Sequence, residues 1–205
     1  MSKIQLNFLV RDIRKRTDNV IFSKWKGINY VRRYVKLTDA KTEGQLKVRE
    51  AFNKLVDIWK YMGAPLHRGW NLSAVGEDFT GYNAFIGANV RPLRDNLVMK
   101  LFKSTGMDPI RGLSTSVGAQ AGEVSIAFEA IPQGRHLTIF SHYLINGETS
   151  VMPVRHDMGV SPSSPTSITG LNQSGEYVIY GILSDAPYDS SLIMSESVGA
   201  KITMA

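Results

Sequence analysis

Hydrophobic side chains recur at every second position near the start of the chain. Ile4, Leu6, Phe8 and Val10 are each separated by one residue, a spacing that predicts a strand with one buried face. We call residues 1–10 the N-terminal arm. We expect it to pair with a strand of its own chain or to add itself to the edge of a neighbouring copy's sheet.

The stretch NVIFSKWKGINYVRRYVK, residues 19–36, predicts a β-hairpin. Two runs rich in β-branched and aromatic residues, 20–25 and 28–35, flank Lys26 and Gly27. Glycine accepts the positive φ that a tight turn requires. Lys and Arg side chains are threaded through both runs without any acid.

Residues 42–62 have the period of an amphipathic helix. Thr42 and Gln45 fit a capping box at its start, and Gly63 and Pro65 are expected to end it. The apolar positions recur at spacings of four and three and are Val48, Phe52, Leu55, Trp59 and Met62. Two shorter helices are expected within residues 66–74 and 82–86, and Pro92 predicts a helix boundary.

From Leu113 onward the period changes to two. The strand-like runs are EVSIAFEAI, RHLTIFSHYLI, TSVMPV, SITGL, EYVIYGIL and SLIMSESVGAKITM, preceded by LSTSVG. About seven short strands with hairpin-scale spacing predict an antiparallel immunoglobulin-like sandwich. The predicted fold class is an α+β N-terminal module (β-hairpin plus helices), residues 1–105, then a linker, 106–112, and an all-β immunoglobulin-like β-sandwich, 113–205.

The charge of this 205-residue chain is unevenly distributed. Residues 1–105 carry 20 Lys or Arg against 9 Asp or Glu, whereas residues 106–205 carry 4 against 9. Opposed charges of this kind favour either a polyanion on the first half or head-to-tail contact between copies. Both interpretations remain open from the sequence.

Several function classes are excluded or disfavoured by composition. The absence of cysteine excludes disulfides, a thiol nucleophile and a thiolate metal site. The first ten residues do not fit a secretory signal, and no run of about 18 apolar residues predicts a membrane span.

Candidate chemistry is sparse. His136 and His142 share a predicted strand and would lie about 20 Å apart, which excludes a common metal ion. His156, beside Asp157, would need a partner from another strand, and His67 is expected in a loop. No nucleophile elbow or phosphate-binding loop occurs, and the serines of residues 161–167 fit a loop. We therefore expect no catalytic residue, no cofactor site, no metal ligand and no enzyme activity.

The segment SITGLNQSGEYVIYGILSD, residues 167–185, resembles the late strands of fibronectin type III and related immunoglobulin-like modules. Leu171 stands in the turn and Tyr177 opens the next strand, as in those modules. The resemblance implies a corner tyrosine. Its ring would be buried, and its hydroxyl would tie the crossing loop to the backbone. It concerns fold and implies nothing specific about function.

The first half resembles a family of uncharacterised bacterial and phage proteins. The hairpin match is carried by Phe22, Lys24, Trp25, Lys26, Gly27, Val31 and Arg32. The helix match is carried by Thr42, Gln45, Arg49 and Phe52, and the segment TGYNAFIGAN at 80–89 adds to it. The resemblance implies an architecture and a virion or surface-structure context without an assigned activity.

Two functions compete for the basic aromatic hairpin. Its cations could neutralise phosphates while its aromatic rings stack on bases. Alternatively it is an assembly module, because an isolated hairpin is marginal in water and must be completed by the arm, a helix or another chain. The residues predicted to make either contact are Lys24, Trp25, Lys26, Tyr30, Arg32, Arg33 and Lys36.

The function predicted first is a non-enzymatic structural subunit that self-assembles, head to tail, in a virion or a surface filament. The first alternative is a nucleic-acid-binding protein. The second is an adhesin-like binding module that uses the loops of the sandwich.

Overall fold

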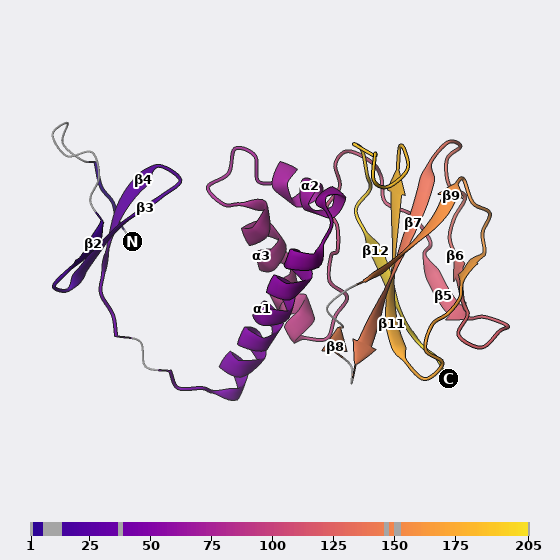
Figure 1. Ribbon diagram of the computed structural model, residues 1–205, viewed down its shortest axis with the longest axis horizontal. Coiled ribbons are helices and arrows are strands. Elements are labelled where there is room, and N and C mark those ends of the chain that lie inside the picture. The colour runs from indigo at the N-terminus through magenta and orange to yellow at the C-terminus, as the bar shows by residue number, and fades with distance from the viewer. Residues whose placement is uncertain (1, 6–13, 37–38, 146–147, 150–152, 205) are drawn as a thin grey trace. The chain divides into compact units, whose positions relative to one another are not determined.

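The computed structural model describes residues 2–5, 14–36, 39–145, 148–149 and 153–204 (Figure 1). The chain divides into two compact units, Met1–Thr42 and Glu43–Ala205. We call them the N-terminal unit and the main unit, and each is described by itself.

The N-terminal unit is a small antiparallel sheet. Its strands are β1 (Ser2–Lys3), β2 (Lys15–Thr17), β3 (Val20–Trp25) and β4 (Ile28–Arg33), in the order β1-β4-β3-β2. The predicted hairpin is confirmed, with β4 ending two residues earlier than Val35.

Three helices begin the main unit, the number that the sequence predicted for this part of the chain. They are α1 (Glu43–Tyr61), α2 (Ala64–Leu72) and α3 (Gly81–Arg94). Gly63 caps α2 and separates it from α1. Thr80 caps α3 by accepting a hydrogen bond from the Asn83 amide at 3.2 Å.

The buried face of α1 differs from the predicted one. Leu55 and Met62 are buried as expected, but Val48 and Phe52 remain 37% and 41% exposed. Ala51 and Ile58 complete the buried stripe instead. The same helical spacing fits two neighbouring stripes, and packing selects between them.

The helix boundary predicted at Pro92 is wrong, because α3 continues through it to Arg94. Proline lacks the amide that would bond to the carbonyl four residues earlier, at Ala88. Ala88 is exposed, so water can bond to that carbonyl. The lost hydrogen bond therefore costs little at this position.

The rest of the main unit forms two antiparallel sheets. Their strands are β5 (Ser114–Val117), β6 (Val124–Ala127), β7 (His136–Ile145), β8 (Glu148–Thr149), β9 (Val154–Val160), β10 (Thr166–Ile168), β11 (Glu176–Ser184) and β12 (Val198–Thr203). One sheet has the order β10-β6-β5; the other has β12-β11-β7, with β8 and β9 both paired to β7. The immunoglobulin-like β-sandwich is confirmed, with β9 as a strand that the sequence did not predict.

The larger sheet is covered on both faces. In β11, Tyr177, Ile179 and Leu183 belong to the core between the two sheets. The alternate residues Val178, Tyr180 and Ile182 belong to a second core with the helices. The main unit therefore has three layers, with the helices on one side of this sheet and β5 and β6 on the other (Figure 1).

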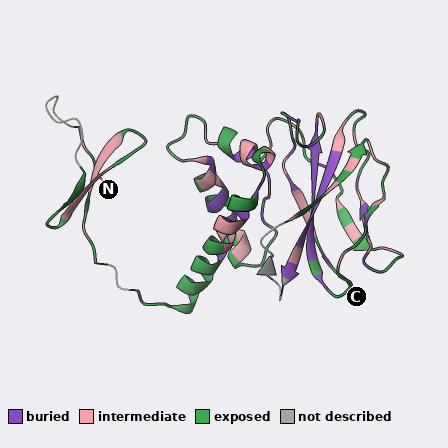
Figure 2. Cartoon of the chain, viewed as in Figure 1, coloured by how far each residue is buried: buried purple, intermediate pink, exposed green. Residues whose placement is uncertain are grey.

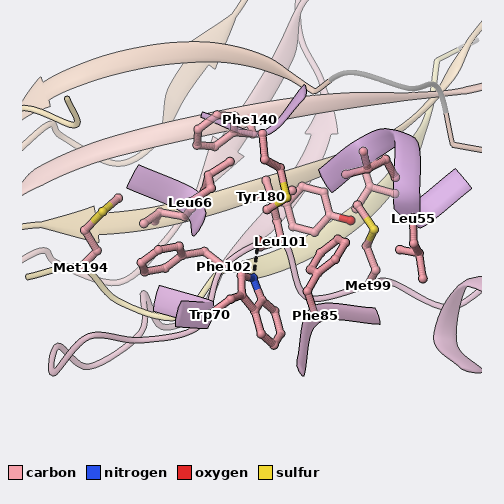
Figure 3. Packing of buried hydrophobic residues seen from close by; sticks show 14 of the residues in the cluster. Leu55, Leu66, Trp70, Phe85, Met99, Leu101, Phe102, Phe140, Tyr180 and Met194 are labelled. Atoms are coloured by element: carbon pink, nitrogen blue, oxygen red, sulfur yellow. Dashed lines mark hydrogen bonds between the residues drawn. The ribbon is translucent and has the colours of Figure 1, made fainter. Parts of the chain in front are cut away.

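Aromatic residues join the helices to the sheet in the second core. Trp70 of α2 donates from its indole nitrogen to the Leu101 carbonyl oxygen at 3.2 Å and lies edge-to-face with Phe85 of α3 (Figure 3). Tyr180 lies in the same cluster.

The predicted boundary at residues 106–112 differs from the observed division after Thr42. Ile110 is buried in the core between the sheets, and the Arg111 carbonyl accepts a hydrogen bond from the Glu129 amide at 3.0 Å. This segment is packed against the sandwich. The three helices belong with the sandwich because they share a core with its larger sheet.

The tyrosine corner is present. The Asn172 amide donates to the Tyr177 hydroxyl at 2.7 Å, which ties the loop before β11 to that strand. Leu171 packs against the core between the sheets. Both residues thus have the place that the fibronectin type III resemblance implied.

Replacing tyrosine with phenylalanine is expected to have opposite effects at two positions of β11. Tyr180 is fully buried, and its hydroxyl has no hydrogen-bond partner among the described residues. Burial also raises its pKa. Tyr180→Phe should raise the free energy of unfolding by about 1 kcal/mol, because it removes a desolvated hydroxyl.

Tyr177→Phe, the matched variant, should lower that free energy by about 1 kcal/mol through loss of the bond from Asn172. Urea denaturation of both proteins measures the difference. A change in the free energy of unfolding with the same sign in both variants would contradict these two predictions.

Candidate assembly and polyanion surface

The turn of the N-terminal hairpin has the predicted geometry. Lys26 and Gly27 both have positive φ, 46° and 81°, as in the type I′ turn that matches the twist of two paired strands. The turn places Trp25 directly opposite Ile28 and Ser23 opposite Tyr30. This register decides which side chains share a face.

The predicted contact residues are divided between two faces of the sheet. Residues paired across strands lie on one face, and successive residues alternate. We call one side the tryptophan face, which consists of Lys3, Arg16, Ile21, Ser23, Trp25, Ile28, Tyr30 and Arg32. The other is the phenylalanine face, which consists of Lys15, Thr17, Val20, Phe22, Lys24, Asn29, Val31 and Arg33.

Three of the seven predicted residues, Trp25, Tyr30 and Arg32, are therefore brought together. Lys24 and Arg33 lie on the opposite face, Lys26 is in the turn, and Lys36 follows β4. Lys3 joins Tyr30 only through the pairing of β1 with β4, which the sequence pattern did not show.

No described residue of the N-terminal unit is buried (Figure 2). Trp25 is 53% exposed, and the apolar residues in the middle of both faces are half-buried. A sheet of this size normally buries one face against another layer.

The N-terminal unit is strongly basic. Residues 1–42 carry 11 Lys or Arg against 3 Asp, whereas residues 43–205 carry 13 against 15 Asp or Glu. The Arg16 guanidinium lies 3.8 Å from the centre of the Tyr34 ring, and its Nε donates to the Asp18 carbonyl at 2.8 Å. These contacts hold one cation against the sheet surface.

The described part of the arm pairs within its own chain. Ser2 and Lys3 pair with Val31 and Tyr30, and the Ile4 amide donates to the Asn29 carbonyl at 3.0 Å. Leu6, Phe8 and Val10 lie outside the described residues.

His67 and His156 each contact a neighbouring side chain of the main unit. His67 lies on α2, not in the predicted loop, and its ring stacks on Trp59 with centroids 4.2 Å apart. His156 Nε2 is 2.9 Å from the Ser141 hydroxyl oxygen, and burial lowers the pKa of His156. Among the described residues, no group of three or more His, Cys, Asp or Glu could hold a metal ion.

The predicted serine-rich loop is hydrogen-bonded to the sandwich through two serine hydroxyls. Ser161 accepts a hydrogen bond from the Gly134 amide, and Ser164 accepts one from the Phe128 amide, each at 2.9 Å.

A hollow of about 560 Å³ lies beside the β6–β7 loop. Its lining comes from residues 106–111 and 129–132, with Arg135, Leu183 and Ile193.

The helices in the described ranges include none long and apolar enough to cross a membrane.

The comparisons with known proteins identify a family. The profile of a family of unknown function, DUF6266, matches residues 12–125, more than half of the chain. The chain therefore belongs to this family. No curated protein sequence matches it.

Two solved structures each match about half of this chain. The FN5 domain of Drosophila Lar is 15% identical over 48% of this chain and 98% of its own, with a TM-score of 0.33. The fn3 domain of the human collagen alpha-1(XX) chain is 17% identical over 50% of this chain and 89% of its own, with a TM-score of 0.37. These scores are low, so the description of the sandwich rests on its strand order and on Tyr177.

Proposed function

We propose that this member of DUF6266 is a non-enzymatic structural subunit that assembles with other copies of itself through the phenylalanine face. The observation that carries the proposal is that apolar side chains occupy the middle of this face, while no described residue of the N-terminal unit is buried. Covering the face with another copy would supply the missing burial.

The phenylalanine face has the composition of a protein interface. Phe22 is directly opposite Val31, and Val20 lies two residues from Phe22 on the same strand. Lys24 and Arg33 stand at the two ends of this apolar group. An apolar centre with a charged rim is the usual anatomy of a protein–protein contact.

Charge favours contact with the main unit of a second copy. Two N-terminal units would repel each other, since each has 11 cationic side chains against 3 acids. The main unit carries 13 cationic side chains against 15 acids and is the better partner. Such a contact is heterologous, so it closes into a ring or continues as a filament. A virion or surface filament is the setting we propose, on the strength of the family resemblance of the hairpin.

The test is the mass of nuclease-treated protein by light scattering after size exclusion, at low and high salt, with negative-stain images of the peak fractions. We expect rings or fibres that become smaller as salt rises. Phe22→Ser should weaken association about 10-fold to 100-fold, because it removes one buried aromatic side chain from each contact.

Ile21→Ser is the matched control. Ile21 is the neighbour of Phe22, is also half-buried and lies on the tryptophan face. It should leave the mass of the assembly unchanged. A wild-type monomer at every concentration and salt, or equal losses in both variants, would overturn the proposal.

A further inference from the structure

The tryptophan face carries cationic and aromatic side chains in neighbouring rows. Arg16 and Arg32 flank Ile21 in one row across three strands. In the next row Tyr30 lies between Lys3 and Ser23. Trp25 and Ile28 form the last row, next to the turn.

This arrangement differs from that of the opposite face. The middle of the tryptophan face is a serine–tyrosine pair, Ser23 and Tyr30, whereas Phe22 and Val31 occupy the middle of the phenylalanine face. Trp25 is diagonal to Tyr30, a placement that separates such residues by about 7–8 Å. The two aromatic residues are therefore neighbours on one face, and the row of Tyr30 also holds Lys3 and adjoins the row of Arg32.

The side chains on this face also differ in exposure from those of the protein core. Trp25 is 53% exposed, while Trp70 is 2% exposed. Arg32 is exposed and makes no ion pair among the described residues, and Tyr30 is half-buried. An exposed tryptophan beside cations offers a ring face on which a base can stack while the cations contact its phosphates.

We propose that the tryptophan face binds single-stranded nucleic acid. Arg32, Lys3 and Arg16 would contact phosphates, while the rings of Trp25 and Tyr30 stack on bases. This function goes beyond self-assembly and uses the opposite face of the same sheet.

A single strand fits this face better than a duplex does. Stacking on Trp25 and Tyr30 requires bases whose faces are accessible, and bases within a duplex are already stacked. Sequence preference is expected to be weak, because every base presents a ring face.

The experiment is fluorescence anisotropy of a labelled oligothymidylate of about 20 nucleotides, titrated with the full-length, nuclease-treated protein at several salt concentrations. Trp25→Ala should raise Kd about 10-fold, and Trp25→Phe, which keeps an aromatic ring, should raise it less. The Phe22→Ser variant should bind as the wild type does, so that failure of assembly and failure of binding are distinguishable.

Arg32→Gln and Arg33→Gln form the decisive pair. The two residues are neighbours, both are exposed, and each variant removes one positive charge, but they lie on opposite faces. Arg32→Gln should reduce the slope of log Kd against log salt by about 0.7, the value for one lost phosphate contact on a single strand. Arg33→Gln should leave the slope unchanged.

Equal effects of Arg32→Gln and Arg33→Gln would overturn the proposal, because diffuse charge would then explain binding. An oligothymidylate affinity that Trp25→Ala does not change would also overturn it. Tighter binding to duplex DNA than to oligothymidylate would also overturn the proposal. So would binding to phosphatidylglycerol vesicles without binding to the oligonucleotide.

Discussion

Trp70→Ala is expected to lower the free energy of unfolding of the main unit by about 3–5 kcal/mol. The Trp70 ring is 2% exposed and lies edge-to-face with Phe85, with centroids 5.4 Å apart. Its removal also leaves the Leu101 carbonyl without the indole donor. The cavity would open in the core that the helices share with the larger sheet.

The helices and the sandwich should therefore lose stability together. Amide hydrogen exchange can compare protection in α2 with protection in β11, at opposite sides of this shared core. We expect the exchange free energies of both to fall by the same amount in Trp70→Ala. Leu72→Ala, in the same helix at a side chain that is 51% exposed, should change neither by more than about 0.5 kcal/mol.

Retained protection in β11 after loss of protection in α2 would contradict this. It would mean that the helices fold apart from the sandwich, as the boundary predicted from the sequence implied.

Gly69→Ala is expected to destabilise the main unit by about 3 kcal/mol. A Cβ at this position of α2 would lie 2.8 Å from the Phe102 ring and closer still to the Lys103 carbonyl oxygen. Backbone cannot move away as a flexible side chain can. The helix and residues 102–103 would have to separate, which disturbs the packing of Phe102 in the core.

Gly87→Ala in α3 is the control for this substitution. A Cβ at Gly87 would meet no atom within 4 Å. The variant should therefore stabilise the protein by about 0.5–1 kcal/mol, because alanine loses less conformational freedom in a helix than glycine does. Denaturation in urea gives both values, and a loss of stability in both variants would show that close approach is not the cause.

Local patterns in the sequence were sufficient for most elements. The hairpin followed from its turn residues, and α1 followed from its period and from Gly63. Tyr177 could be placed because its corner depends on residues close in the chain. These features are decided within a few residues.

The sequence of β11 indicates that both faces of the larger sheet are covered, although the period of two does not. The run YVIYGIL in β11 is apolar at almost every position, which is typical of a strand that is covered on both faces. The strand β9 gave no such signal, because most of its residues are exposed at the edge of the sheet.

The grouping of residues in the candidate surface was predicted only in part. The sequence predicted Trp25, Tyr30 and Arg32 as contact residues, but it grouped them with Lys24 and Arg33. The register of β3 with β4 separates these two groups, since a shift of one residue would exchange the faces.

The sequence by itself thus determined the local elements, the basic character of residues 1–42 and the absence of cysteine chemistry. Tertiary structure decided that the helices belong with the sandwich, which residues of α1 are buried and which side chains share a face of the N-terminal sheet. The physical reason is that helix period and turn chemistry act between near neighbours in the chain. Burial and register, in contrast, depend on the element that packs or pairs alongside.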